Sequence, residues 1–368
     1  MVNVSLTRVE SAADQRRFYS LPWRVYQGDP CWAPHLWPQR KEYLDKRAAF
    51  FTYGEGDFWL AWLDGRVVGT IGTAINHPFN REKGLKAAIF GFFEVLPPGA
   101  SPGYGDEEAW QTARGLWDHA CAWARQRGMT ELRGPYSFNF NDEQGFLVEG
   151  FDTPPAILMG HSHPLYPEWA QRYGFALLQT SLAYRYDLAQ IGFDVNRGPE
   201  IIHRIAERAQ ERHGAHTIRH PELRDWDQEI ERLHQVYNRS LSVLPEFSPI
   251  ELAEFRAQAE GLKPVLDREL IVFAEVGGRT AGFALGLPNL AEALLHANGL
   301  RRPWDYLRLA LARRKITSAS FKILAVDPAY WGYGLEAAMF LEMGKAVIRK
   351  GYTWVDLSLT SELNPQTN

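Results

Sequence analysis

Two glycines in the second half of the chain, Gly332 and Gly334, stand at a point where a backbone can bind an anion. They follow an apolar stretch, Phe321–Val326, which predicts a strand, and they precede residues whose apolar spacing predicts a helix from Leu335 onward. Glycines here let the backbone curl so that its N–H groups converge, and the positive end of the helix dipole adds to them. The pattern therefore predicts a binding site for a pyrophosphate.

The same segment resembles the acyl-CoA pyrophosphate loop of the GNAT superfamily of N-acyltransferases. Gly334 matches the central glycine of that loop, and Gly332 matches the glycine that often precedes it. Two positions depart from the superfamily's pattern, because Trp331 replaces an Arg or Gln and Glu336 replaces a small residue. A carboxylate near the phosphates would repel them. The alternative is therefore a strand-to-helix turn that binds no ligand.

The resemblance implies a co-substrate, acetyl-CoA or another acyl-CoA, and no metal ion. It also implies which residues of the second half would contact CoA. They are Leu324, Ala325, Val326, Trp331, Gly332, Tyr333, Gly334 and Leu335.

The first half carries a candidate catalytic base, Glu94. It lies near the end of Ile89–Val95, which resembles the superfamily's fourth strand, where the pantetheine of CoA pairs and a carboxylate commonly takes the proton of the amine. The alternative is a strand-end glutamate that faces solvent. The glycine-rich segment that follows runs into Asp106 and Glu107, which would compete with phosphate for the start of the next helix. Which half binds CoA therefore stays open.

A tyrosine often protonates the leaving group in this superfamily, from a position just before a Gly-Phe pair. Gly174 and Phe175 match that pair, but Ala170 stands where the tyrosine is expected. Tyr173 is therefore the candidate, with Tyr166 as a second tyrosine nearby. The alternative role of Tyr173 is packing in the core.

A long polar loop follows the predicted strand Thr130–Gly134, and functional loops often lie at strand ends. Its candidate ligands for an amine acceptor are Asn139, Asn141, Asp142 and Glu143. The alternative is a loop that these side chains merely brace. His161 and His163 lie further on but give no recognised metal-ligand spacing with the acids, so we expect no metal site. This loop and the opening Leu21–Tyr26 resemble a bacterial group of tandem GNAT-like proteins of unassigned substrate, over nearly the whole chain.

The elements that must position these residues occur twice. Residues 58–76 and 270–289 each predict a hairpin, with an apolar strand, a turn that contains glycine, and a second strand. A strand, an amphipathic helix and another strand then follow in each half. The helices end at Arg127-Gly128 and Lys350-Gly351. We therefore predict an α/β fold of two tandem GNAT-like domains with mixed sheets, residues 1–190 and residues 191–368.

The second copy stops after the strand Thr353–Leu359, whereas the first copy continues into a further helix and strands. We therefore expect the second copy to be truncated at its C-terminus and this strand to be an exposed sheet edge. Exposed edges pair with other chains, so a homo-oligomer formed through this edge is a further expectation.

Composition narrows the class of protein. The 368 residues carry a net charge of −4, which argues against nucleic acid as a partner. The sequence contains two cysteines, no apolar leader at its start and no apolar run of membrane-spanning length. We expect a cytoplasmic protein with no membrane partner.

The predicted function is acyl-CoA-dependent N-acylation of an unidentified small-molecule or peptide amine. Two alternatives stay open. A GNAT-fold binding or scaffold protein without turnover would explain the imperfect phosphate loops in both halves. An aminoacyl or peptidyl transferase of tandem GNAT type would require a basic groove for tRNA, which the acidic net charge disfavours.

Overall fold

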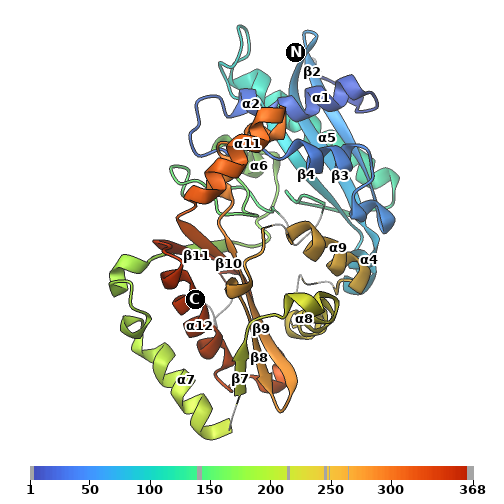
Figure 1. The fold of residues 1–368 in the computed structure, drawn as a ribbon. Helices are drawn as coiled ribbons and strands as arrows, with labels where there is room; N and C mark the ends of the chain where they lie inside the picture. The colour runs from blue at the N-terminus through green and yellow to red at the C-terminus, as the bar shows by residue number, and fades with distance from the viewer. Residues whose placement is uncertain are drawn as a thin grey trace. The chain divides into compact units, whose positions relative to one another are not determined.

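The computed structural model of this chain describes residues 4–138, 143–213, 216–243, 247, 249–263 and 265–362. The chain divides into two compact units (Figure 1). Unit 1 comprises Met1–Leu177 and Ala291–Arg313, and unit 2 comprises Leu178–Leu290 and Arg314–Asn368. Among the described residues, none of the helices has the length and apolar character needed to cross a membrane.

Unit 1 is built on a mixed sheet in the order β1-β2-β3-β4-β5. Its strands are β1 (Ser5–Arg8), β2 (Gly54–Leu63), β3 (Arg66–Asn76), β4 (Ala87–Val95) and β5 (Glu131–Arg133). The first four strands pair antiparallel, and β4 pairs parallel with β5. The predicted hairpin is β2–β3, and its turn residue Gly65 has a φ of 72°, which favours glycine.

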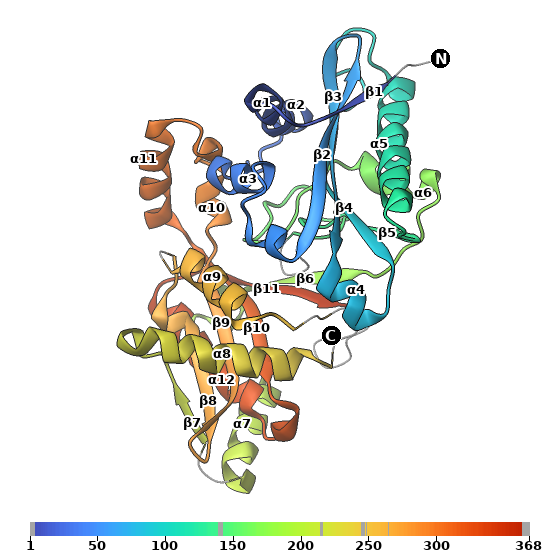
Figure 2. The same cartoon turned by 90° about the vertical axis from the view of Figure 1, so that its right-hand side faces the viewer.

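Helices cover both faces of this sheet, with α5 on one side and α1 to α3 on the other (Figure 2). The helices of unit 1 are α1 (Ala12–Ser20), α2 (Pro22–Val25), α3 (Trp37–Leu44), α4 (His77–Lys83), α5 (Asp106–Gln126), α6 (Leu165–Tyr173), α10 (Ala291–Leu294) and α11 (Pro303–Ala312). Helix α5 buries the face that its sequence predicts, including Trp110, Ala113 and Trp117, because apolar residues three and four positions apart lie on one side of a helix.

Unit 2 contains a second mixed sheet in the order β6-β11-β10-β9-β8-β7. Its strands are β6 (Ser181–Asp187), β7 (His216–Arg219), β8 (Ile271–Val276), β9 (Arg279–Pro288), β10 (Ser318–Val326) and β11 (Trp354–Ser361). Its helices are α7 (Glu200–His213), α8 (Trp226–Leu241), α9 (Leu252–Leu262) and α12 (Leu335–Arg349). Strands β10 and β11 are parallel, as β4 and β5 are in unit 1. The tandem mixed-sheet fold predicted from the repeated order of elements is therefore confirmed.

Two segments lie in a different unit from the one that their place in the sequence suggested. Strand β6 pairs antiparallel with β11, with Tyr186 opposite Val355. The expected boundary at residue 190 therefore falls inside unit 2, and the prediction that β11 is an exposed edge is wrong. The segment Ala291–Arg313, which interrupts unit 2 between β9 and β10 in the sequence, packs in unit 1. Apolar alternation predicts a strand but not the sheet that it joins.

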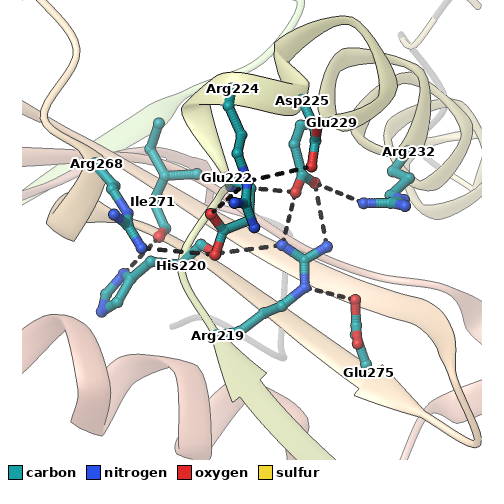
Figure 3. Close-up of polar contacts among 10 residues, drawn as sticks. All are labelled: Arg219, His220, Glu222, Arg224, Asp225, Glu229, Arg232, Arg268, Ile271 and Glu275. Carbon is teal, nitrogen blue, oxygen red and sulfur yellow. Dashed lines mark hydrogen bonds and ion pairs between the residues drawn. The ribbon is translucent and has the colours of Figure 1, made fainter.

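A network of ion pairs joins β7, β8 and α8 in unit 2 (Figure 3). The Arg219 guanidinium donates to both carboxylate oxygens of Glu229, at 2.8 and 3.1 Å, and its Nε donates to Glu275 at 2.6 Å. Glu229 is 1% exposed. Burial by itself would raise the pKa of Glu229, but the hydrogen bonds and charge of Arg219 outweigh it and lower this pKa below its usual value. The network fastens a helix to the sheet.

Candidate active site

Glu94 lies beside an irregularity in the sheet of unit 1. In the pairing of β3 with β4, Thr70 is opposite Glu94 and Gly72 is opposite Gly91, so β4 holds an extra residue between these pairs. Within this bulge Phe92 has a φ of 50°, a conformation that costs free energy for a residue with a side chain. The Thr70 hydroxyl donates to the Phe92 carbonyl at 3.0 Å. Bulges of this kind redirect the side chains that follow them, here that of Glu94.

Two tyrosine hydroxyls hold the Glu94 carboxyl. Tyr26, just after α2, lies 3.2 and 3.0 Å from the two carboxyl oxygens. Tyr166, on α6, donates to Oε2 at 2.9 Å, and its hydroxyl also accepts the Val95 N–H at 2.8 Å. Both tyrosines are buried. The glutamate is therefore fixed by groups from two helical segments that flank the end of β4.

The environment changes the acidity of all three groups. Burial raises the pKa of Glu94 to about 8, although the hydrogen bonds from Tyr166 and Tyr26 oppose this shift. Burial and the neighbouring Glu94 charge raise the pKa values of Tyr26 and Tyr166 well above the usual value. The tyrosines therefore remain protonated donors near neutral pH. A carboxyl whose pKa is close to the working pH is suited to general acid–base catalysis.

Glu94 is one of the residues that line a small pocket with a cavity volume of about 40 Å³, which is room for a few waters or for one end of a ligand. Helices α1 to α3 and the loop between α2 and α3 supply most of its wall. The lining residues are Phe18, Tyr19, Pro22, Trp23, Trp32, His35, Arg40, Thr70, Phe92 and Glu94. Five of the ten side chains are Phe, Tyr or Trp, so the wall is mainly apolar with a few polar groups.

Two basic side chains belong to this wall. The Arg40 guanidinium lies 4.2 Å from the centre of the Phe92 ring, a cation–π distance. The pKa of His35 is held well below its ordinary value by burial and by the positive charge of Arg40, so His35 is neutral at pH 7. Its Nδ1 is 3.4 Å from an oxygen of Glu143. The pocket therefore offers one permanent cation and one neutral imidazole beside the carboxyl.

The residues proposed for catalysis and acceptor binding fall in different places. Tyr173 donates to Asp118 at 2.8 Å and lies 3.6 Å from the sulfur of Cys121, both on α5. Of the two tyrosines on α6, Tyr166 reaches Glu94 and Tyr173 does not contact it. Of the loop residues, Asn139, Asn141 and Asp142 lie outside the described part of the chain. Glu143 reaches His35 on the pocket wall.

The proposed CoA loop lies in unit 2, at the start of α12. Gly332 and Gly334 both have the positive φ values that favour glycine, 81° and 69°. A Cβ atom on Gly334 would lie 2.8 Å from the Cβ of Ala209 and 3.0 Å from the carbonyl oxygen of Ile205, so α7 packs against this glycine. Trp331 donates from its indole N–H to the carbonyl of Val326 at 3.1 Å. The contacts of α7 account for Gly334, and CoA binding here stays a prediction.

The remaining proposed CoA contacts are also at this strand-to-helix junction. Leu324, Ala325 and Val326 form the end of β10 and pair with β9. Tyr333 packs against Tyr330, and Leu335, the first residue of α12, is fully buried.

The corresponding helix start in unit 1 is capped by the protein itself. Gly105 precedes α5, and its N–H donates to Oε2 of Glu108 at 2.9 Å. This is a capping interaction, and it places a carboxylate near the end of the helix that would attract a phosphate. Each unit therefore covers part of its own helix start, by a side chain in unit 1 and by a helix in unit 2.

The described residues include no group of three or more His, Cys, Asp or Glu side chains placed to hold a metal ion. His161 instead pairs with Asp29, with 2.7 Å between Nε2 and Oδ2. This pair lies next to Tyr26, whose ring centre is 5.5 Å from that of His161.

Sequence reasoning missed most of the pocket wall and also the Tyr26 hydroxyl that holds Glu94. Tyr26, His35 and Arg40 lie far from Glu94 in the sequence, and none of them belongs to the repeated elements. A signal was nonetheless present, because residues 18–37 contain six Phe, Tyr or Trp residues. So many aromatic residues in a segment outside the predicted sheets are compatible with the wall of a pocket as well as with packing in a hydrophobic core.

Comparisons with known proteins agree with the fold. No protein-family model matches the chain. The chain is 30% identical to a protein named bacterial ceramide synthase from Caulobacter vibrioides. The alignment spans 331 residues, which are 89% of this chain and 82% of that protein. It is 27% identical over 304 residues to the protein YghO of Escherichia coli, across 83% of this chain and 73% of that protein.

Two solved structures show the same fold at low sequence identity. One is a tandem GNAT protein from the clavulanic acid biosynthesis pathway, with a TM-score of 0.55 and 14% identity, covering 99% of this chain and 92% of that chain. The other contains a glucosamine N-acetyltransferase region in a fungal multi-domain β-N-acetylglucosaminidase, with a TM-score of 0.51 and 11% identity, covering 99% of this chain and 36% of that chain. The resemblance to the GNAT superfamily is thereby confirmed at the level of the fold.

Proposed function

The chain belongs to the family of the Caulobacter vibrioides bacterial ceramide synthase, and from this premise we propose that it transfers an acyl group from acyl-CoA to the primary amine of a long-chain amino alcohol. The product would be an amide of the ceramide type. One observation carries the proposal, namely the Glu94 carboxyl, whose pKa is raised to about 8, facing an aromatic pocket.

The Glu94 carboxylate would act as the base. A primary ammonium has a pKa of roughly 10, so the acceptor arrives protonated and must lose a proton before it can attack. Glu94 takes this proton, and the amine nitrogen then bonds to the thioester carbonyl carbon. The nitrogen then loses a second proton as the bond from that carbon to sulfur breaks. The leaving thiolate takes up one of the two protons and the other passes to solvent, so that ammonium and thioester give amide, thiol and one free proton. Tyr26 and Tyr166 keep the carboxyl in place throughout.

The pocket suits a lipid-like amine better than a hydrophilic one. Its aromatic side chains, which include Trp23, Trp32 and Phe92, would bury alkyl groups, at about 25 cal/mol for each Å² of apolar surface removed from water. His35 and Arg40 supply hydrogen-bond partners that a hydroxyl close to the amine requires. An amino alcohol with a hydrocarbon chain has both features.

The test is an acyl-transfer assay with the purified full chain, palmitoyl-CoA and sphinganine. We expect an amide, detected by mass spectrometry, and one free thiol for each amide formed. The Glu94→Gln variant should lower kcat about 100- to 10,000-fold, which is the usual contribution of a general base. The matched control is Glu168→Gln, an exposed glutamate on the helix that carries Tyr166, and it should retain full activity.

Two results would contradict the proposal. The first is full turnover by Glu94→Gln, which would remove Glu94 from the mechanism. The second is the absence of amide with sphinganine while a hydrophilic amine is acylated, which would retain the transferase and remove the lipid acceptor.

A second candidate function is a binding protein that keeps the fold without turnover. The observation in its favour is that the protein's own groups partly cover both helix starts, at Gly105 and at Gly334. Calorimetry with CoA separates the two candidates. An absence of binding at millimolar CoA, together with tight binding of the amine, would favour the binding protein.

A further inference from the structure

Helix α11 turns most of its apolar residues outward. Trp304, Tyr306, Leu307 and Leu311 are each more than half exposed. Trp304, Leu307 and Leu311 are separated by three and four positions, so they form one stripe along the helix. The buried residue of α11 is an acid, Asp305. This is the reverse of the usual arrangement in a surface helix.

The charges around this stripe have one predominant sign. Asp305 is 0% exposed, and its Oδ2 accepts the N–H of Arg302 at 2.9 Å, which caps the start of the helix. Arg302, Arg308 and Arg313 are exposed. We call these three arginines and the four exposed apolar residues the α11 face. In a chain with a net charge of −4, the α11 face is locally cationic.

The α11 face is connected to the pocket of unit 1 through a short helical turn, η6 (Asn298–Leu300). The hydroxyl of Tyr19 donates to the carbonyl of Gly299 at 2.9 Å, and the indole N–H of Trp23 donates to Oδ1 of Asn298 at 3.1 Å. Tyr19 and Trp23 both line the pocket. Figure 2 shows α3 between α11 and the sheet of unit 1.

We propose that the α11 face binds the surface of a lipid bilayer that contains anionic lipids, and that the amine lipid passes from this bilayer to the pocket beside Glu94. Aromatic side chains at the level of the headgroups, leucines below them and arginines at the flanks are the features of helices that lie in a membrane interface. The charge of the α11 face selects this partner, because each exposed cation near an anionic bilayer strengthens binding. The identity of the lipid rests on the proposed function, whereas binding to the bilayer does not.

Helix α7 of unit 2 provides the contrast that makes the proposal specific. It also exposes apolar side chains, including Ile201. Its charges are of both signs, however, with Glu200, Arg204 and Glu207 within the first two turns, so an anionic surface gains little from it. Ile201→Ser is therefore a matched control for the loss of an exposed apolar side chain.

The experiment measures sedimentation of the full chain with vesicles. One set contains phosphatidylcholine alone, and the other contains equal parts of phosphatidylcholine and phosphatidylglycerol. We expect binding to the anionic vesicles that weakens as salt is added, since the Debye length falls to about 8 Å at physiological ionic strength. Leu307→Ser with Leu311→Ser should weaken binding about 100-fold, Arg308→Gln about fivefold, and Ile201→Ser not at all. Unchanged melting temperatures show that the variants fold.

The outcomes separate this inference from the proposed function. Equal sedimentation with both vesicle sets, or binding that survives the double leucine variant, overturns the docking surface. A dimer that the double variant dissociates, in the absence of vesicle binding, assigns the α11 face to a second copy of the chain and also overturns it. Acylation of sphinganine in detergent tests the transferase independently. If the double variant acylates in detergent but not in anionic vesicles, the supply route from the bilayer is supported.

Discussion

Each unit contains a glutamate that is largely withdrawn from water, the half-buried Glu94 in unit 1 and the buried Glu229 in unit 2, and the pKa values of the two are shifted in opposite directions. Burial raises the pKa of Glu94 in unit 1 to about 8, where two tyrosine hydroxyls hold the carboxyl. In unit 2, Arg219 binds both oxygens of Glu229 and holds the pKa of that carboxyl below its usual value. A neutral donor orients a carboxylate but does not balance its charge, whereas a guanidinium does both. The group that binds the carboxyl therefore decides the role of such a glutamate. Neutral hydroxyls leave it able to exchange a proton near neutral pH, whereas a guanidinium keeps it charged in a structural ion pair.

The largest expected effect is a loss of stability when the cation beside Glu229 in unit 2 is removed. Arg219→Met leaves Glu229 buried without its bidentate partner, so we expect a loss of about 3–5 kcal/mol in the free energy of unfolding, measured in urea. The control is Arg232→Met, which removes a more exposed cation 3.3 Å from the same carboxylate and should cost about 1 kcal/mol or less. Equal losses in the two variants would show that Arg219 has no special role.

The pH dependence of stability should differ in sign between the two glutamates. The folded pKa of Glu94, about 8, is above its unfolded value of about 4.3, so the stability linked to it is present below the unfolded pKa and is lost as pH rises through 8. Glu94→Gln should therefore raise the melting temperature at pH 9, by the equivalent of roughly 5 kcal/mol, and should match the wild type at pH 4.

Glu229 provides the opposite case for that measurement. Its folded pKa is lowered, so its contribution is present above the unfolded pKa and is lost as pH falls through the folded pKa. Glu229→Gln should lose stability at pH 8 and approach the wild type in acid. If both variants change in the same direction with pH, the comparison fails.

A smaller effect is expected when one of the hydroxyls on Glu94 is removed. In the wild type, kcat/KM should rise with pH through about 8 as Glu94 loses its proton. The hydrogen bond from Tyr26 favours the carboxylate, so Tyr26→Phe should move this rise to higher pH and lower the rate at pH 7 about tenfold, the equivalent of one hydrogen bond to a charge. Tyr173→Phe is the control, because Tyr173 binds Asp118. A shift of the profile in Tyr173→Phe instead would restore Tyr173 as a catalytic candidate.

The smallest effect is expected on CoA affinity, when the acids at the starts of α5 and α12 are removed in turn. Glu336 lies in the first turn of α12, and Glu107 lies in the first turn of α5. A carboxylate there repels a phosphate, at a cost of about 0.3–1 kcal/mol in binding free energy. Removing the carboxylate should therefore tighten CoA binding about two- to fivefold in the unit that holds CoA. Calorimetry with Glu336→Gln and Glu107→Gln identifies that unit. We predict the gain for Glu336→Gln, and a gain for Glu107→Gln alone would move the CoA site to unit 1.

The sequence by itself determined the elements and their repetition. The hairpins β2–β3 and β8–β9, and the buried faces of α5 and α12, follow from periodicities of two and of 3.6 residues that any short window contains. Glu94 could be selected because it ends a strand that resembles a known one. These inferences succeeded because they depend on neighbours along the chain.

The tertiary structure decided which elements meet. Strand β6 has the same alternation whether it completes the first sheet or the second, and only its pairing with β11 settles the choice. The partners of Glu94 are Tyr26 and Tyr166, which are 68 and 72 residues away in the sequence. The acidity of a carboxyl depends on its desolvation and on the donors that reach it. Packing brings both of these from distant segments, so the presence of Glu94 could be read from the sequence but its pKa could not.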